Sequence, residues 1–193
     1  RLNALHPKPY GFGQYIYERI VKAPGRHYLW PRRPDVPFDR RTPREIRIRP
    51  GRRGPVLASL LVSGSIEKGH TVTCEITLWR GCDWVELSYR LRKPATPDPE
   101  AGYIAFPFRQ DLMPLRGEVL GGLMEPGKDQ IPRSASDWQC LQNYIVAGSE
   151  SPLGVWVTQD APLVQFGDIN TGKYLDVIEV KQPESFKSFG EKA

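Results

Sequence analysis

The feature that most constrains this chain is a strict alternation of polar and apolar residues over positions 70–78. The apolar members that share one side of this segment are Val72, Cys74, Ile76 and Leu78. Side chains two residues apart point to the same face of a β-strand, so this period is typical of a strand with one buried and one solvated face. The sequence therefore predicts a strand over residues 70–78.

Two further segments lie close enough along the chain to pair with this strand. Residues 56–66 are rich in apolar side chains, and three turn residues, 67–69, join them to His70. Residues 84–92 alternate again after a second short turn at 80–83. Because short turns connect antiparallel neighbours, we expect these three segments to form an antiparallel meander.

Short apolar segments continue toward the C-terminus, and turn residues separate nearly all of them. The strand candidates are 103–108, 118–124, 143–148, 154–159, 163–166 and 174–180. Many short strands in a chain with 18 glycines and 19 prolines predict an all-β fold, an antiparallel β-sandwich. One or two helical turns are expected at 134–141, where Ser134 or Ser136 suits the cap position.

A run rich in arginine and proline precedes the meander. Residues 26–53 hold ten arginines, no lysine and three acids, whereas the whole chain carries a net charge of only +5. Seven prolines between positions 24 and 55 fix φ and remove backbone donors, which excludes a helix or a central strand there. The positive charge therefore belongs to a segment that we expect to be extended.

These patterns predict one structural domain with two appendages. Residues 1–55 form an extended arm with a short strand or helical turn near 11–20, residues 56–181 form the β-sandwich, and residues 182–193 form a loose tail. Arginine forks bind carboxylates as well as phosphates. We therefore expect the arm to contact a protein surface and regard nucleic acid as the less favoured partner.

Motifs for catalysis and metal binding are missing from the sequence. The histidines His6, His27 and His70 lie far apart, without zinc-ligand spacing. Acids that could form a glycosidase pair stand at expected loop positions, where turns favour them. We assign no catalytic residue and no metal ligand.

Cysteine usage and hydropathy bear on the location of the protein. Three cysteines without a CxxC pair indicate reduced thiols and a cytoplasmic protein. The longest apolar run is much shorter than the roughly 20 residues of a transmembrane helix, so we expect no membrane span.

Residues 121–138 have the composition of a sugar-binding loop. Glycines permit close approach, Asp129, Gln130 and Arg133 offer polar groups, and Trp138 offers an aromatic face. Trp79 and Trp84 are further stacking candidates, although they can equally pack on each other across a hairpin. The alternative for the whole loop is a structured segment that packs against another domain, and both interpretations stay open.

Five motifs follow one another in a distinctive order. They are GQYIYER at 13–19, YIAFPF at 103–108, GG at 121–122, DQIPRSASDW at 129–138 and LGVWVT at 153–158. In this order the chain resembles the C-terminal β-sandwich region of bacterial α-mannosidase-like enzymes of glycoside hydrolase family 38. The resemblance extends over most of residues 11–169.

The resemblance implies a supersandwich of the kind also seen in galactose mutarotase. In that family the aspartate nucleophile and the zinc ligands belong to an N-terminal catalytic domain, and no segment of this chain matches those parts. The resemblance thus implies a non-catalytic portion of a retaining α-mannosidase, with zinc expected only in the catalytic domain. That domain of the same parent chain is the expected partner, with an oligosaccharide or a second copy as further partners. A free-standing carbohydrate-binding module is the alternative.

Overall fold

The protein folds as an antiparallel all-β structure, as the sequence predicts. The computed structural model describes residues 10–20, 38–98, 100–107, 114–131, 138–148 and 154–166. These residues contain strands and turns but no helix, and hence none long and apolar enough to cross a membrane. The described residues between 10 and 107 form one compact unit, and those between 114 and 166 form another. We call them the first and the second unit; the sequence indicated a single domain.

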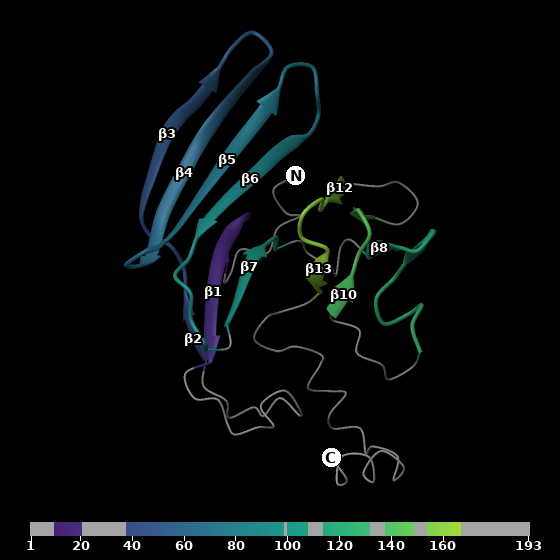
Figure 1. Ribbon diagram of the computed structural model, residues 1–193. Helices are drawn as coiled ribbons and strands as arrows, with labels where there is room; N and C mark the ends of the chain where they lie inside the picture. The colour runs from purple at the N-terminus through teal and green to yellow at the C-terminus, as the bar shows by residue number, and fades with distance from the viewer. Residues whose placement is uncertain are drawn as a thin grey trace, which may run out of the picture. The chain divides into compact units, whose positions relative to one another are not determined.

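The larger sheet of the first unit contains the predicted meander. Its order is β3-β4-β5-β6, and all neighbours are antiparallel (Figure 1). The strands are β3 (Arg44–Arg53), β4 (Leu57–Glu67), β5 (His70–Trp79) and β6 (Val85–Arg92). The meander over residues 56–92 is therefore confirmed, with one more strand at its edge.

Strand β3 corrects the expectation of a separate arm over residues 1–55. Although it holds Pro50 and several arginines, it pairs with β4 along ten residues. It does so as an edge strand, where a missing N–H is tolerated, and its register shifts on both sides of residues 47–50. At the first shift Glu45 has a φ of 52°, as befits a β-bulge. In the described part of the proline-rich run, β2 and β3 are edge strands, so the exclusion of a central strand is confirmed there, whereas the arm is wrong for residues 44–53.

A smaller sheet completes the first unit. Its order is β2-β1-β7, and its strands are β1 (Gln14–Ile20), β2 (Phe38–Arg41) and β7 (Glu100–Ala105). Tyr15 and Tyr17 of the central strand β1 pack on Ile66 and Val72 of the larger sheet. Apolar side chains from two sheets thus share one core, which is the arrangement of a β-sandwich.

The second unit also consists of two antiparallel sheets. One has the order β12-β11-β8-β9, and the other pairs β10 with β13. The strands are β8 (Leu115–Val119), β9 (Gly122–Met124), β10 (Trp138–Cys140), β11 (Tyr144–Ala147), β12 (Gly154–Val157) and β13 (Leu163–Gln165). Leu141, Ile145 and Phe166 form its buried core.

Strand β10 corrects the helical turn expected at 134–141. Trp138, Gln139 and Cys140 pair with residues 163–165, so this part of the segment is extended. A β-partner supplied by the distant β13 overrides a local cap signal, and tryptophan suits a strand in any case. Residues 132–137 lie outside the described residues, as do the strand expected at 174–180 and the tail at 182–193.

A substitution at Gly64 tests the β3–β4 pairing. A Cβ there would lie 2.8 Å from Ile46 Cδ1 and 2.9 Å from Pro43 Cβ. We expect Gly64→Ala to lower the free energy of unfolding of the first unit by about 1–3 kcal/mol, because this space is already filled. Gly54→Ala is the control, since a Cβ at Gly54 would meet only Leu57 O at 4.0 Å. Urea unfolding measures both, and equal midpoints would contradict the register described here.

Candidate functional site

Asp129 and Gln130, expected to contact a sugar or another domain, hold a turn of their own loop. Asp129 Oδ2 accepts a hydrogen bond from the backbone N–H of Glu125 at 2.8 Å. Gln130 Oε1 accepts one from the N–H of Gly127 at 3.0 Å, and Gly127 itself has a φ of 80°. These contacts favour the alternative in which both residues stabilise a structured loop. Arg133, predicted with them, lies outside the described residues.

The three tryptophans predicted as sugar contacts differ in exposure. Trp84 is 56% exposed beside the β5–β6 turn, and Trp138 on β10 is 36% exposed. Trp79 is half-buried at the end of β5 and donates a hydrogen bond from Nε1 to Glu86 Oε2 at 3.0 Å. Trp79 and Trp84 belong to the first unit and Trp138 to the second. The structure therefore unites only Trp79 and Trp84 at one hairpin.

One face of the β3–β6 sheet is mostly apolar, with Arg53 at one corner. Residues directly opposite in an antiparallel ladder share a face. Val62, Cys74 and Tyr89 oppose one another across β4, β5 and β6, and the rows on either side continue the pattern. Alternation on β5 predicted this face, and the register extends it to all four strands.

The small β2-β1-β7 sheet buries only one end of that face. Val72 and Cys74 are buried near Tyr15 and Tyr17. Other apolar side chains of the face are between 48% and 67% exposed: Ile46, Ile48, Leu60, Leu78, Val85 and Leu91. We call these six residues the apolar patch. Leu60, Leu78 and Val85 lie at the uncovered end, whereas Ile46, Ile48 and Leu91 lie on the edge strands beside the buried rows. Exposed apolar side chains gathered on one sheet face mark an interaction site in soluble proteins.

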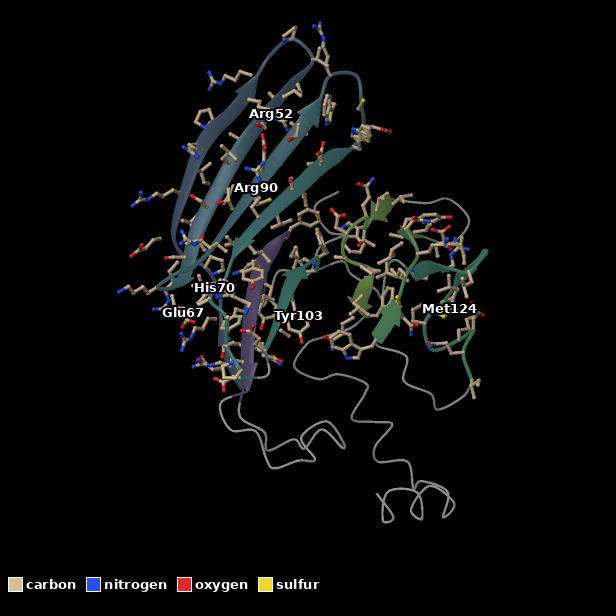
Figure 2. The ribbon with its side chains drawn as sticks, viewed as in Figure 1. Arg52, Glu67, His70, Arg90, Tyr103 and Met124 are labelled. Carbon is tan, nitrogen blue, oxygen red and sulfur yellow. The ribbon has the colours of Figure 1, made fainter. Side chains whose placement is uncertain are left out.

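The opposite face of the same sheet is polar and basic. Its side chains on the edge strands are mostly arginines, and those on the two central strands are mostly serines and threonines. The arginines are Arg44, Arg47, Arg49, Arg52, Arg90 and Arg92, and the acids are Glu75 and Glu86. We call this surface the arginine face. Figure 2 labels Arg52 and Arg90 on the sheet.

Near one end of the arginine face, a hydrogen-bonded network links three strands. Arg52 Nε donates to Glu75 Oε1 at 2.8 Å, and Arg52 Nη2 donates to Thr77 Oγ1 at 3.2 Å. The Ser59 hydroxyl also donates to Glu75 Oε1, at 2.7 Å. The hydrogen bonds from Ser59 and Arg52 hold the pKa of Glu75 below its usual value. Glu75 is therefore an ionised carboxylate that holds the Arg52 side chain over the sheet by an ion pair.

A second cluster surrounds His70, where the two sheets of the first unit meet. His70 is wholly buried, and its Nε2 lies 3.3 Å from the Tyr15 hydroxyl. The Tyr17 ring stands edge-on to the imidazole, with centroids 4.7 Å apart. His70 Nδ1 finds no hydrogen-bond partner among the described residues. Figure 2 shows His70 beside Glu67 at the end of the sheet away from Arg52.

The titration of the cluster follows from this burial. Burial lowers the pKa of His70 against the opposing influence of Glu67. Burial and the hydrogen bond to Glu100 raise the pKa of Tyr17 to about 12. Burial raises the pKa of Glu100, but hydrogen bonds from Lys93 and Tyr17 outweigh it, so the net pKa is lowered. Because His70 is wholly buried, we assign it a packing role in the core of the sandwich and no contact with a substrate.

Groups that could bind a metal ion were sought among the described side chains. Within the described residues, no group of three or more His, Cys, Asp or Glu side chains is arranged to hold a metal ion. The cysteines Cys74, Cys82 and Cys140 are all free thiols.

The arginine face was not predicted, although its signal is present in the sequence. The arginine-rich run was predicted to be an extended arm, whereas it contains an edge strand. Its register places Arg44 and Arg47 opposite serines of β4 and Arg49 opposite Leu61, and Arg52 donates hydrogen bonds to Glu75 and Thr77 on β5. The period of two within Arg47-Ile48-Arg49 was the available clue.

Comparison of the chain with protein-family models, with curated proteins and with solved structures finds no match in any of the three.

Stability should depend on pH through His70. Because its pKa in the folded protein lies below the unfolded value of 6.5, the unfolded chain takes up a proton first as the pH falls, and stability declines. We expect the urea midpoint of the first unit to fall between about pH 7.5 and about pH 5.5, and less so in His70→Gln. An equal fall in both proteins would assign the dependence to other groups.

Two threonine substitutions on β5 test the extent of the apolar patch. Val72→Thr buries an extra hydroxyl in a space of the same shape and should cost about 1–3 kcal/mol of unfolding free energy. Leu78→Thr, on the same face but 56% exposed, should change it by about 0.5 kcal/mol or less. Urea unfolding of both variants decides the point. A large loss in Leu78→Thr would show that the chain itself covers this end of the sheet.

Proposed function

We propose that the chain is the non-catalytic C-terminal β-sandwich portion of an α-mannosidase-like glycoside hydrolase of family 38. In this proposal it packs on a catalytic domain outside this sequence and completes it. The proposal has two supports: the order of the five motifs between residues 13 and 158, and the apolar patch.

The apolar patch is the observation that carries the packing role. A β-sandwich buries the apolar face of each sheet against a second layer, because exposed apolar area costs about 25 cal/mol per Å². Here the small sheet covers one end of the β3–β6 face, while Ile48, Leu60 and Leu78 stay exposed. A second protein layer over the patch satisfies this requirement. That layer is the catalytic domain in the parent enzyme, and a second copy of the chain takes its place when the chain is alone.

The chemistry of the parent enzyme then lies elsewhere. The nucleophile and zinc are supplied by the catalytic domain, and the present chain contributes stability and a contact surface. Three free cysteines, one of them buried, suit a reducing compartment, and we place the parent enzyme in the cytoplasm.

A free-standing carbohydrate-binding module is the second candidate. It is favoured by Trp84, an exposed indole at the tip of a hairpin, with Trp79 on the adjoining strand. Indole faces stack on sugar rings in such modules. This candidate needs no further domain.

The mass and activity of the native protein separate the two candidates. An antibody raised against the 193-residue chain is used to capture the protein from its source cells. We expect a polypeptide several times heavier than 21.9 kDa that hydrolyses 4-nitrophenyl α-mannoside with retention and loses activity to a zinc chelator. A captured polypeptide of 21.9 kDa without hydrolase activity would contradict the proposal and leave the binding module.

A further inference from the structure

The arginine face has a repeated arrangement that its register reveals. One row across the sheet is Arg47, Ser63, Thr73 and Arg90, and the next is Arg44, Ser65, Thr71 and Arg92. Each row thus begins and ends with arginine on an edge strand and has two hydroxyls between. The rows lie one strand repeat apart, roughly 7 Å, since alternate residues share a face.

The dimensions of this pattern follow from sheet geometry. Four strands separated by about 4.8 Å place the arginines of β3 and β6 roughly 14 Å apart at their Cα atoms. Long side chains stand at both edges, and short serines and threonines lie between them. An extended polymer can lie along the strands with its backbone over the hydroxyls and its charged groups next to the guanidinium groups.

The charges of the arginine face are largely uncompensated. Six arginines share this face of the sheet with two glutamates, and one of the glutamates, Glu75, already forms an ion pair with Arg52. Among the described residues, no carboxylate lies within ion-pair distance of Arg44, Arg47, Arg49, Arg90 or Arg92, and all five are exposed. Several like charges held on a rigid sheet attract an anion, and the guanidinium fork binds carboxylate, sulfate or phosphate oxygens in pairs.

We propose that the arginine face binds an anionic polysaccharide laid along the strands, with its acidic groups on the two arginine rows and its hydroxyls on the serines and threonines. This goes beyond the packing role proposed above and does not depend on it, because the apolar patch lies on the other face of the sheet. The shared chemistry of the ligand is a glycan with carboxylate, sulfate or phosphate substituents.

The central strands favour a glycan over other polyanions. Ser63, Ser65, Thr71 and Thr73 offer hydroxyl groups that both donate and accept, which matches the hydroxyls of a sugar. Trp79 lies on the same face at the end of β5, where an indole can stack on one sugar ring. A single-stranded nucleic acid needs an aromatic platform for each successive base, and none of the eight residues in the two arginine rows is aromatic.

Two polymers of matched sugar configuration test the proposal. Polymannuronate carries a carboxylate on every residue, whereas mannan carries none. We expect calorimetric titration of the full chain to show binding of polymannuronate that weakens as salt is raised, and at least about tenfold weaker binding of mannan. Dextran sulfate and a phosphorylated mannan serve as further arms that identify the preferred acidic group.

A pair of double variants locates the site. Arg47→Gln with Arg90→Gln removes both ends of one row and should weaken polymannuronate binding at least about tenfold, the equivalent of 1.4 kcal/mol. Arg53→Gln with Arg80→Gln removes the same charge elsewhere and should weaken it less than about threefold. Arg53 pairs with Ala58 on the apolar side, and Arg80 lies in the β5–β6 turn.

Several results would overturn the proposal. Equal losses in the two double variants would assign binding to net charge alone. Equal affinity for mannan and polymannuronate would remove the role of the acidic groups. Tighter binding of oligo(dT) at matched charge would assign the arginine face to a nucleic acid, and tighter binding of poly(glutamate) would assign it to an acidic protein. Absence of binding to every probe would also refute the proposal. The comparison of polymers on the unsubstituted chain stands even if a variant fails to fold.

Discussion

The packing of Tyr15 and Tyr17 against one end of the β3–β6 sheet determines what the rest of the first unit can be. These side chains bury Ile66, Val72 and His70, and Gly102 leaves room for the Tyr15 ring because a Cβ there would lie 2.9 Å from the tyrosine oxygen. Three short strands cover a sheet whose own strands are up to eleven residues long. The mismatch in length divides the apolar face of the larger sheet into a covered end and an open end.

The two faces of the larger sheet have opposite chemistry, and this follows from alternation in four strands at once. On β5 the even-numbered residues from 72 to 78 are apolar and the odd-numbered ones are mostly threonine, and the antiparallel register carries the pattern to β3, β4 and β6. A one-residue slip in any strand would place arginines among leucines. Burial of Val72 and Cys74 at the closed end holds the register, and thereby also positions the arginines on the opposite side.

Alternation and turn residues were enough to predict the all-β class and the meander, since both are local signals. Strand β3 was not predicted because the many prolines around it argue against a strand more strongly than the short alternation at Arg47-Ile48-Arg49 argues for one. Pairing with β4, which the sequence does not reveal, makes this segment a strand despite its prolines. The strand β10 was missed because its partner β13 lies more than twenty residues further along the chain. For Asp129 and Gln130 the sequence left a sugar contact and a structured loop both open, because turn residues and sugar-binding residues share the same polar groups. Their partners at Glu125 and Gly127 became visible only in three dimensions.

The irregular backbone of β3 has a consequence for the solution behaviour of the protein. An edge strand with regular geometry offers its free N–H and C=O groups to any other strand, which is how sheets aggregate. In β3, Pro50 removes one donor, a bulge with Glu45 at φ 52° and a second register shift break the ladder, and arginines repel an identical edge. This edge is consequently a poor template for growth. A chain with an exposed apolar patch can thus avoid forming fibres through this edge.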